Sequence, residues 1–133
     1  MAATENDGLR ADVELRLPAD SAYVSVLRTT TAGLAARLDF PIDDIEDLRI
    51  AVGEASAMVL PEASAGSDLL CLFYLAPGEL TVKVEVTSAE TVHPDFDSFA
   101  WQVLSTLATS AEAQSEGDRF SVSLTMQPVG AGL

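Results

Sequence analysis

The sequence predicts an α+β fold, a two-layer sandwich in which helices cover one face of a mixed or antiparallel β-sheet. Four segments alternate apolar and polar residues or are continuously apolar, as strands are. Three others repeat apolar residues at three- and four-residue steps, as amphipathic helices do. The order is strand, helix, helix, strand, strand, helix, strand, which allows the helices to pack as one layer on the sheet.

The first strand and the first helix are predicted between residues 13 and 38. VELRL at residues 13–17 alternates apolar and charged side chains, which is the periodicity of a half-buried strand. Pro18 ends this strand, and Asp20 or Ser21 can cap the helix that follows. One buried stripe is expected on this helix, formed by Val24, Leu27, Thr31, Leu34 and Leu38.

The second helix is predicted at residues 43–60. Asp43 and Glu46 have nearly the spacing and chemistry of a capping box, with the aspartate as the cap. Glu54 and Met58 lie on a face about a quarter-turn away from the apolar stripe. That stripe is expected to consist of Ile45, Leu48, Val52, Ala55 and Val59.

A hairpin, a third helix and a last strand complete the prediction. LLCLFYL at residues 69–75 and LTVKVEV at residues 80–86 flank the turn APGE. Because the first of these strands is apolar on both faces, we expect it to be central in the sheet. A helix is predicted at residues 97–112, with Phe96, Ala100, Val103 and Leu107 as its apolar positions, and RFSVSLTM at residues 119–126 forms the last strand.

Length and charge limit the organisation and the partners. The 133 residues, 48% of them hydrophobic, predict one domain at residues 12–127 between polar tails at 1–11 and 128–133. The net charge of −14 makes direct nucleic-acid binding unfavourable, because phosphate contacts need Lys and Arg. The acidity either favours a basic protein partner or only keeps the domain soluble.

The expected compartment is the cytoplasm, without membrane contact. No apolar run is long enough to span a bilayer, and the first residues have no basic region followed by an apolar stretch, as a signal peptide would. The single cysteine, Cys71, cannot build a disulfide framework or a cysteine metal site. Its apolar surroundings in the sequence predict a small core residue.

Residues 12–60 carry a resemblance to RsbW-type anti-sigma factors. The resemblance rests on the apolar spacing, on the Pro-x-Asp-x-Ile-x-Asp-Leu pattern of PIDDIEDL and on the AVGEA segment around Glu54. The order of elements fits as far as residue 127, and SFAWQVLSTLA is similar to the late helix of divergent members. The resemblance implies the Bergerat-type (HATPase-like) fold of histidine kinases and Hsp90.

For function, the resemblance implies a switch in transcription regulation of the kind used in stress responses. Such proteins bind a sigma factor and keep it from RNA polymerase, and an anti-anti-sigma partner competes for them. Members with intact motifs phosphorylate that partner on Ser or Thr with ATP and magnesium. Relatives of this fold often form homodimers through the sheet or a strand edge, and we expect a homodimer here.

The family's nucleotide-binding motifs are degenerate in this sequence. Glu54 matches the glutamate that acts on the attacking hydroxyl, but Met58 stands where an asparagine ligates magnesium. A thioether is a soft, weak acceptor, whereas magnesium requires hard oxygen ligands. Ser88 and Glu90 replace the adenine-reading Asp-x-Gly motif.

The lid and the charge distribution also argue against a nucleotide. Ser98 and Ala100 fall where the family has a glycine-rich lid, and Phe99 between them suits a core better than a triphosphate. No Lys or Arg occurs between Lys83 and Arg119, whereas this stretch holds seven Asp and Glu residues. We expect weak or absent ATP binding, and neither a cofactor nor a metal.

Arg28 is the candidate for partner binding. It lies on the outer flank of the first helix, and the resemblance implies that it contacts both the sigma factor and the anti-anti-sigma protein. Purely structural interpretations remain open: Arg28 as an ordinary surface residue, Glu54 as a solvated helix residue, and Met58 as a side chain that fills the former nucleotide pocket. His93 in its loop is not expected to be catalytic, and Trp101 is expected in the core or an interface.

Two functions follow from these observations. The first is a nucleotide-independent anti-sigma factor, a degenerate kinase or pseudokinase that sequesters its sigma factor and is regulated by an anti-anti-sigma partner. The alternative is an active Ser/Thr protein kinase with rewired contacts to ATP and magnesium. A scaffold that acts on an unrelated regulator remains a third possibility.

Overall fold

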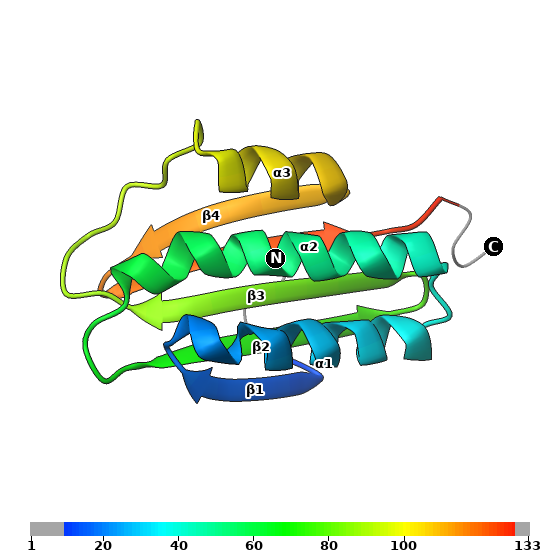
Figure 1. Cartoon of the computed structure of the whole chain (residues 1–133), viewed down its shortest axis with the longest axis horizontal. Helices are drawn as coiled ribbons and strands as arrows, with labels where there is room; N and C mark the ends of the chain where they lie inside the picture. Colours follow the sequence, from blue (N-terminus) through cyan, green and yellow to red (C-terminus); the bar gives the residue numbers. More distant parts are fainter. Residues whose placement is uncertain (1–9, 130–133) are drawn as a thin grey trace.

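The computed structural model describes residues 10–129 and has two layers, with the helices packed on one face of a five-stranded sheet (Figure 1). Short 3-10 turns at Ser21–Tyr23 and Leu60–Glu62 flank the two longer helices. The elements in chain order are β1 Val13–Pro18, α1 Val24–Arg37, α2 Ile42–Val59, β2 Asp68–Ala76, β3 Glu79–Thr87, α3 Phe99–Leu107, β4 Ser110–Glu116 and β5 Arg119–Met126. The predicted α+β sandwich is therefore confirmed.

The sheet has the order β1-β2-β3-β5-β4, and every neighbouring pair is antiparallel. Of the two possibilities left by the sequence, mixed or antiparallel, the sheet is antiparallel. The doubly apolar strand β2 lies between β1 and β3, away from both edges, as expected. The edges are β1 and β4.

The predicted order of elements is wrong in one place, after residue 107. The expected helix at 97–112 is shorter, because α3 ends at Leu107 and Ser110–Glu116 forms the additional strand β4. This segment, SAEAQSE, has small and polar side chains of low intrinsic strand propensity. It forms a strand because β5 offers it a free edge, with Ala111 opposite Leu124 and Ala113 opposite Val122.

Helix α2 is the centre of the helical layer. It packs over β3 and β5, with α1 along one side and α3 along the other (Figure 1). All five positions of its predicted stripe are buried. On α1, Val24, Leu27 and Thr31 are buried as predicted, and Ala35 is buried in place of Leu34 and Leu38, which are half-buried.

The starts of the helices differ in detail from the prediction. Asp20 caps the 3-10 turn ahead of α1, since its Oδ1 accepts a hydrogen bond of 2.9 Å from the Ala22 amide. The capping box predicted at Asp43 is wrong, because α2 begins at Ile42 after Pro41 and has no side-chain cap. Asp43 instead lies in the first turn, where its charge faces the positive end of the helix dipole.

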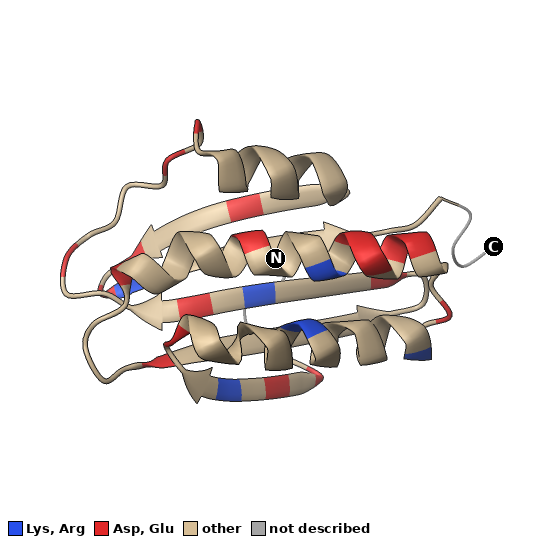
Figure 2. Ribbon diagram, in the orientation of Figure 1, with Lys and Arg blue, Asp and Glu red and all other residues tan. Residues whose placement is uncertain are grey.

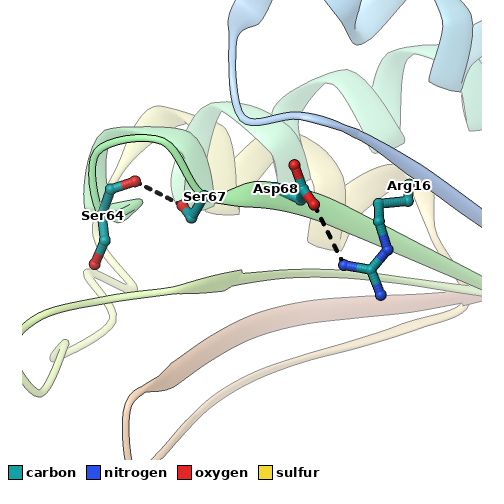
Figure 3. Close-up of polar contacts among 4 residues, drawn as sticks. All are labelled: Arg16, Ser64, Ser67 and Asp68. Atoms are coloured by element: carbon teal, nitrogen blue, oxygen red, sulfur yellow. Dashed lines mark hydrogen bonds and ion pairs between the residues drawn. The ribbon is translucent and has the colours of Figure 1, made fainter.

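Polar contacts hold the start of β2. The Ser67 hydroxyl donates to the Ser64 carbonyl over 2.6 Å, and Arg16 Nη1 on β1 lies 3.5 Å from Asp68 Oδ2 (Figure 3). Arg119 pairs with Glu85 across β5 and β3 over 3.1 Å. Both ion pairs lie on the face of the sheet that the helices leave uncovered, and exposed pairs of this kind contribute little stability.

The core joins the helix stripes to the inner face of the sheet. Its largest fully buried side chains include Phe73, Phe120, Leu27, Leu48 and Leu104. Within residues 10–129, no helix is long and apolar enough to cross a membrane. Most of the predicted tails, residues 1–9 and 130–133, lies outside the described residues.

Removal of a core side chain from α2 tests this packing. We expect Leu48→Ala, at a position with no exposed surface, to lower the free energy of unfolding by about 3 kcal/mol, through lost burial and a residual cavity. Urea unfolding followed by circular dichroism measures this change. The matched control is Val26→Ala on the outer face of α1, where the side chain is 41% exposed and the expected loss is small. Equal losses for the two variants would contradict the described core.

The buried thiol gives a second prediction. Burial in β2 raises the pKa of Cys71 from its ordinary value of 9.0 to about 12. The folded protein therefore keeps this proton where the unfolded chain loses it, so the stability that Cys71 contributes is present below pH 9 and is lost as the pH rises towards 12. At pH 8 we expect a thiol reagent to modify Cys71 in urea but not in buffer. Rapid modification in buffer would refute its burial.

Candidate functional site

Two hollows adjoin α2, and they divide the predicted site residues between them. The α2–α3 cavity lies at the C-terminal end of α2, below the loop that leads into α3, and includes Met58, Ser98 and Ala100 in its lining. The Arg28 groove is the second hollow and is lined by Arg28, Glu46, Arg49, Ile50 and Glu54. The structure thus brings Met58 together with the predicted lid positions, and it brings Glu54 together with Arg28.

The α2–α3 cavity has a volume of about 220 Å³ and a mainly apolar lining. Val92 and Pro94 from the connecting loop, and Phe120 from β5, supply much of this lining. Two carboxylates, Glu62 and Asp95, stand at the cavity, and its lining contains no Lys or Arg. The cavity can therefore accept a small, largely apolar group and offers a polyanion no positive charge.

The lid positions form the start of a helix. The Ser98 hydroxyl accepts a hydrogen bond of 3.2 Å from the Trp101 amide and caps α3, whose first turn holds Ala100. Phe99 was expected to suit a core, but it is 77% exposed. Phe96 is also exposed, and its ring meets that of Trp101 edge-on at a centroid distance of 4.9 Å.

Ser88 and Glu90, predicted at the adenine-reading position, are not in the lining of the α2–α3 cavity. Ser88 is buried beyond the end of β3, and its hydroxyl donates to the Glu90 carbonyl over 2.8 Å. The Ser88 amide donates to the Asp118 carbonyl over 2.7 Å. The bond to Asp118 attaches the chain after β3 to the β4–β5 turn, and the bond to Glu90 holds the local turn, so Ser88 has a structural role in this fold.

The Arg28 groove lies on the outer surface between α1 and α2 and has a volume of about 280 Å³. Ile50 is 48% exposed there, which gives the groove an apolar element between charged side chains. Arg49 pairs with Glu46 of the same helix, with 3.8 Å between Nε and Oε1. Figure 2 shows that acidic residues dominate the first turns of α2, so the cations of this groove stand in an acidic surrounding.

Arg28 reaches this groove from α1 and packs against α2 at Gly53. Its guanidinium lies against Gly53, since a Cβ atom added to this glycine would be 2.6 Å from Nη2 and 2.9 Å from Nε. The described part of the chain offers Arg28 no carboxylate within 4.0 Å. Arg28 is therefore a half-buried cation that is available to an anionic group from outside.

Sequence reasoning missed several residues of both hollows. Gly53 and Ile50 were not expected in a site, and neither were Glu62 and Asp95. One signal was present, because a glycine in the interior of a helix disfavours the helix and has a packing or functional reason when it is kept. The remaining residues carry no comparable signal, since only the folded chain brings them to the same hollow.

Comparison with known proteins gives a partial sequence match. No protein-family model matches the chain. The chain is 43% identical over 51 residues to proteins named serine-protein kinase RsbW from Bacillus thuringiensis (strain Al Hakam), Bacillus cereus (strain B4264) and Bacillus anthracis (strain CDC 684 / NRRL 3495). The match covers 38% of this chain and 32% of each relative, so it spans about a third of the length of these proteins.

A solved structure extends the likeness to most of the fold. The crystal structure of the RsbU and RsbW domains of a Mycobacterium tuberculosis protein matches with a TM-score of 0.68, over 86% of this chain and 31% of that one. The sequence identity is 14%, so this match concerns the fold alone. The sequence match and the shared fold together confirm the predicted resemblance: the chain is similar to RsbW-type proteins and has their HATPase-like α/β sandwich.

Proposed function

We propose that this protein is an anti-sigma factor that binds a sigma factor of RNA polymerase in the cytoplasm and withholds it from the polymerase. An anti-anti-sigma protein competes for the same surface and releases the sigma factor. The sequence likeness to RsbW proteins supports this class of function. The observation that carries the proposal is the Arg28 groove, where the chain presents a cation without an internal carboxylate partner beside an exposed Ile50.

Charge supports a protein partner. With a net charge of −14, the chain repels nucleic acid at long range and attracts a basic surface. A sigma factor binds DNA and therefore presents basic regions. Arg28 would supply the local exception, a bidentate contact to a carboxylate of the partner within an otherwise acidic surface.

The proposed activity does not use a nucleotide. The residues of the α2–α3 cavity do not fit magnesium-ATP, because Met58 offers a thioether where a hard oxygen ligand is needed. Glu62 and Asp95 add negative charge to the lining, which contains no Lys or Arg and has His93 as its one basic side chain. The volume of about 220 Å³ is also below the roughly 300–1,000 Å³ typical of ligand pockets.

An active Ser/Thr kinase is the second candidate. Two observations favour it: the relatives are named serine-protein kinases, and Glu54, which matches the family's glutamate, is present on α2 and half-buried. In this candidate Glu54 would act on the attacking hydroxyl of the anti-anti-sigma protein. Because Glu54 lines the Arg28 groove and Met58 lines the α2–α3 cavity, this role requires ATP to bind in a way that joins the two hollows.

We also propose that the protein acts as a homodimer. The face of the sheet opposite the helices carries half-buried apolar side chains on β2, namely Leu70, Leu72 and Tyr74. Pairing of two copies through this face would cover them. Burial raises the pKa of Tyr74, and Glu14 and Glu85 nearby raise it further, so the ring stays neutral at such an interface.

Titration with ATP separates the two candidate functions. We expect calorimetry in excess magnesium to detect no binding tighter than about 10 μM, because Met58 offers no hard ligand at its position and the lining of the cavity has no Lys or Arg. RsbW from Bacillus cereus, titrated in the same way, is the positive control. Tight binding by this chain, together with transfer of phosphate to an anti-anti-sigma protein, would favour the kinase.

Substitution of Arg28 tests the binding surface. Affinity capture from the native organism with the tagged protein first identifies the sigma factor. We then expect Arg28→Ala to weaken binding of this sigma factor by at least about tenfold, because a buried or half-buried arginine contact is a frequent hot spot. The matched control is Arg37→Ala, which removes an exposed arginine from the last turn of α1. Unchanged affinity of a folded Arg28→Ala variant would exclude Arg28 from the interface.

A further inference from the structure

We propose that Gly53 is the positioning residue of Arg28: the missing side chain at position 53 makes room for the guanidinium against α2 and keeps it in the Arg28 groove. The steric part of this inference concerns the free protein alone. Its consequence for sigma-factor binding rests on the proposed function.

The contact between the two residues is close and one-sided. A Cβ atom at position 53 would stand 2.6 Å from Nη2, 2.9 Å from Nε and 3.1 Å from Cζ of Arg28. Nη2 and Nε are thus nearer than a side chain at position 53 allows, and Cζ is at the limit of a tight contact. Because the obstructed group is the far end of a flexible side chain, an alanine there would displace the guanidinium and leave the helices in place.

The rest of α1 and α2 shows why this glycine is unusual. A glycine in a helix interior weakens the helix relative to alanine. Gly33 on α1 is exposed, and a Cβ added to it would meet none of the described atoms within 4 Å. Gly53 is a buried residue of α2, and the Arg28 guanidinium lies next to it. At this position the low helix propensity of glycine therefore accompanies a specific contact, which Gly33 does not make.

The position of the Arg28 guanidinium determines whether it can pair with carboxylates of its own chain. Glu46 and Glu54 line the same groove, yet neither lies within 4.0 Å of Arg28 as an ion-pair partner in the described structure. A guanidinium held against the α2 backbone stays unpaired and free to bind a carboxylate of a partner. A displaced guanidinium has two carboxylates of its own chain at hand, and pairing with either would withdraw it from the partner.

The first test uses the free protein. Gly53→Ala and the matched control Gly33→Ala are compared with the wild type by NMR of the arginine Nε–Hε groups, and Arg28→Ala identifies the Arg28 signal. We expect the Arg28 signal to move in Gly53→Ala and to keep its wild-type position in Gly33→Ala, while both variants unfold in urea at or above the wild-type midpoint. An unmoved Arg28 signal in Gly53→Ala would overturn the inference.

The second test measures binding of the sigma factor captured by the wild-type chain. We expect Gly53→Ala to weaken binding about tenfold, Gly33→Ala to leave it unchanged, and Gly53→Ala combined with Arg28→Ala to bind no more weakly than Arg28→Ala alone. Additive losses in the double variant would refute action through Arg28. If the wild type captures no sigma factor, the proposed function fails, whereas the NMR signal still decides whether Gly53 positions Arg28.

Discussion

The burial of α2 is the constraint on which the other features depend. This helix lies over β3 and β5 and between α1 and α3, so its sheet side and both flanks are covered (Figure 1). Leu48, Val52 and Val59 expose no surface. Only the outer stripe of α2 and its C-terminal end remain accessible, and these are the places where the Arg28 groove and the α2–α3 cavity form. A binding site on this side of the protein therefore depends on side chains from the elements next to α2, and Arg28 of α1 is one of them.

The periodicity of apolar residues was sufficient to predict most of the fold, because burial of these residues determines how the helices and strands pack. The apolar stripe of α2 and the alternating apolar residues of β3 and β5 must face the core, which fixes the orientation of these three elements. Strand β4 could not be predicted in this way, since its order comes from pairing with β5 and its side chains are small or polar. The predicted stripe on α3 is confirmed only in part: Ala100, Val103 and Leu107 are half-buried, whereas Phe96 is exposed and the one buried residue of the helix is Leu104.

Only those residues of the candidate site that match motifs of the RsbW-type proteins could be predicted from the sequence. Met58, Ser98 and Ala100 meet at one cavity because the order of elements brings the end of α2 to the start of α3. Ser88 is held beyond the end of β3 by bonds of its hydroxyl and amide to neighbouring backbone, and such local turns cannot be predicted from the order of elements. The contact of Arg28 with Gly53 depends on the path of one long side chain, and no periodicity reports such a path.

The location of the single cysteine has a consequence for signalling. Oxidants react with accessible thiolates, and the rate follows the thiolate fraction and its exposure. Cys71 is enclosed in the core, and its pKa of about 12 leaves almost no thiolate near neutral pH. The single cysteine thus offers peroxide or nitrosative stress no reactive thiolate, so a circuit built on this protein would have to sense thiol oxidation in another component.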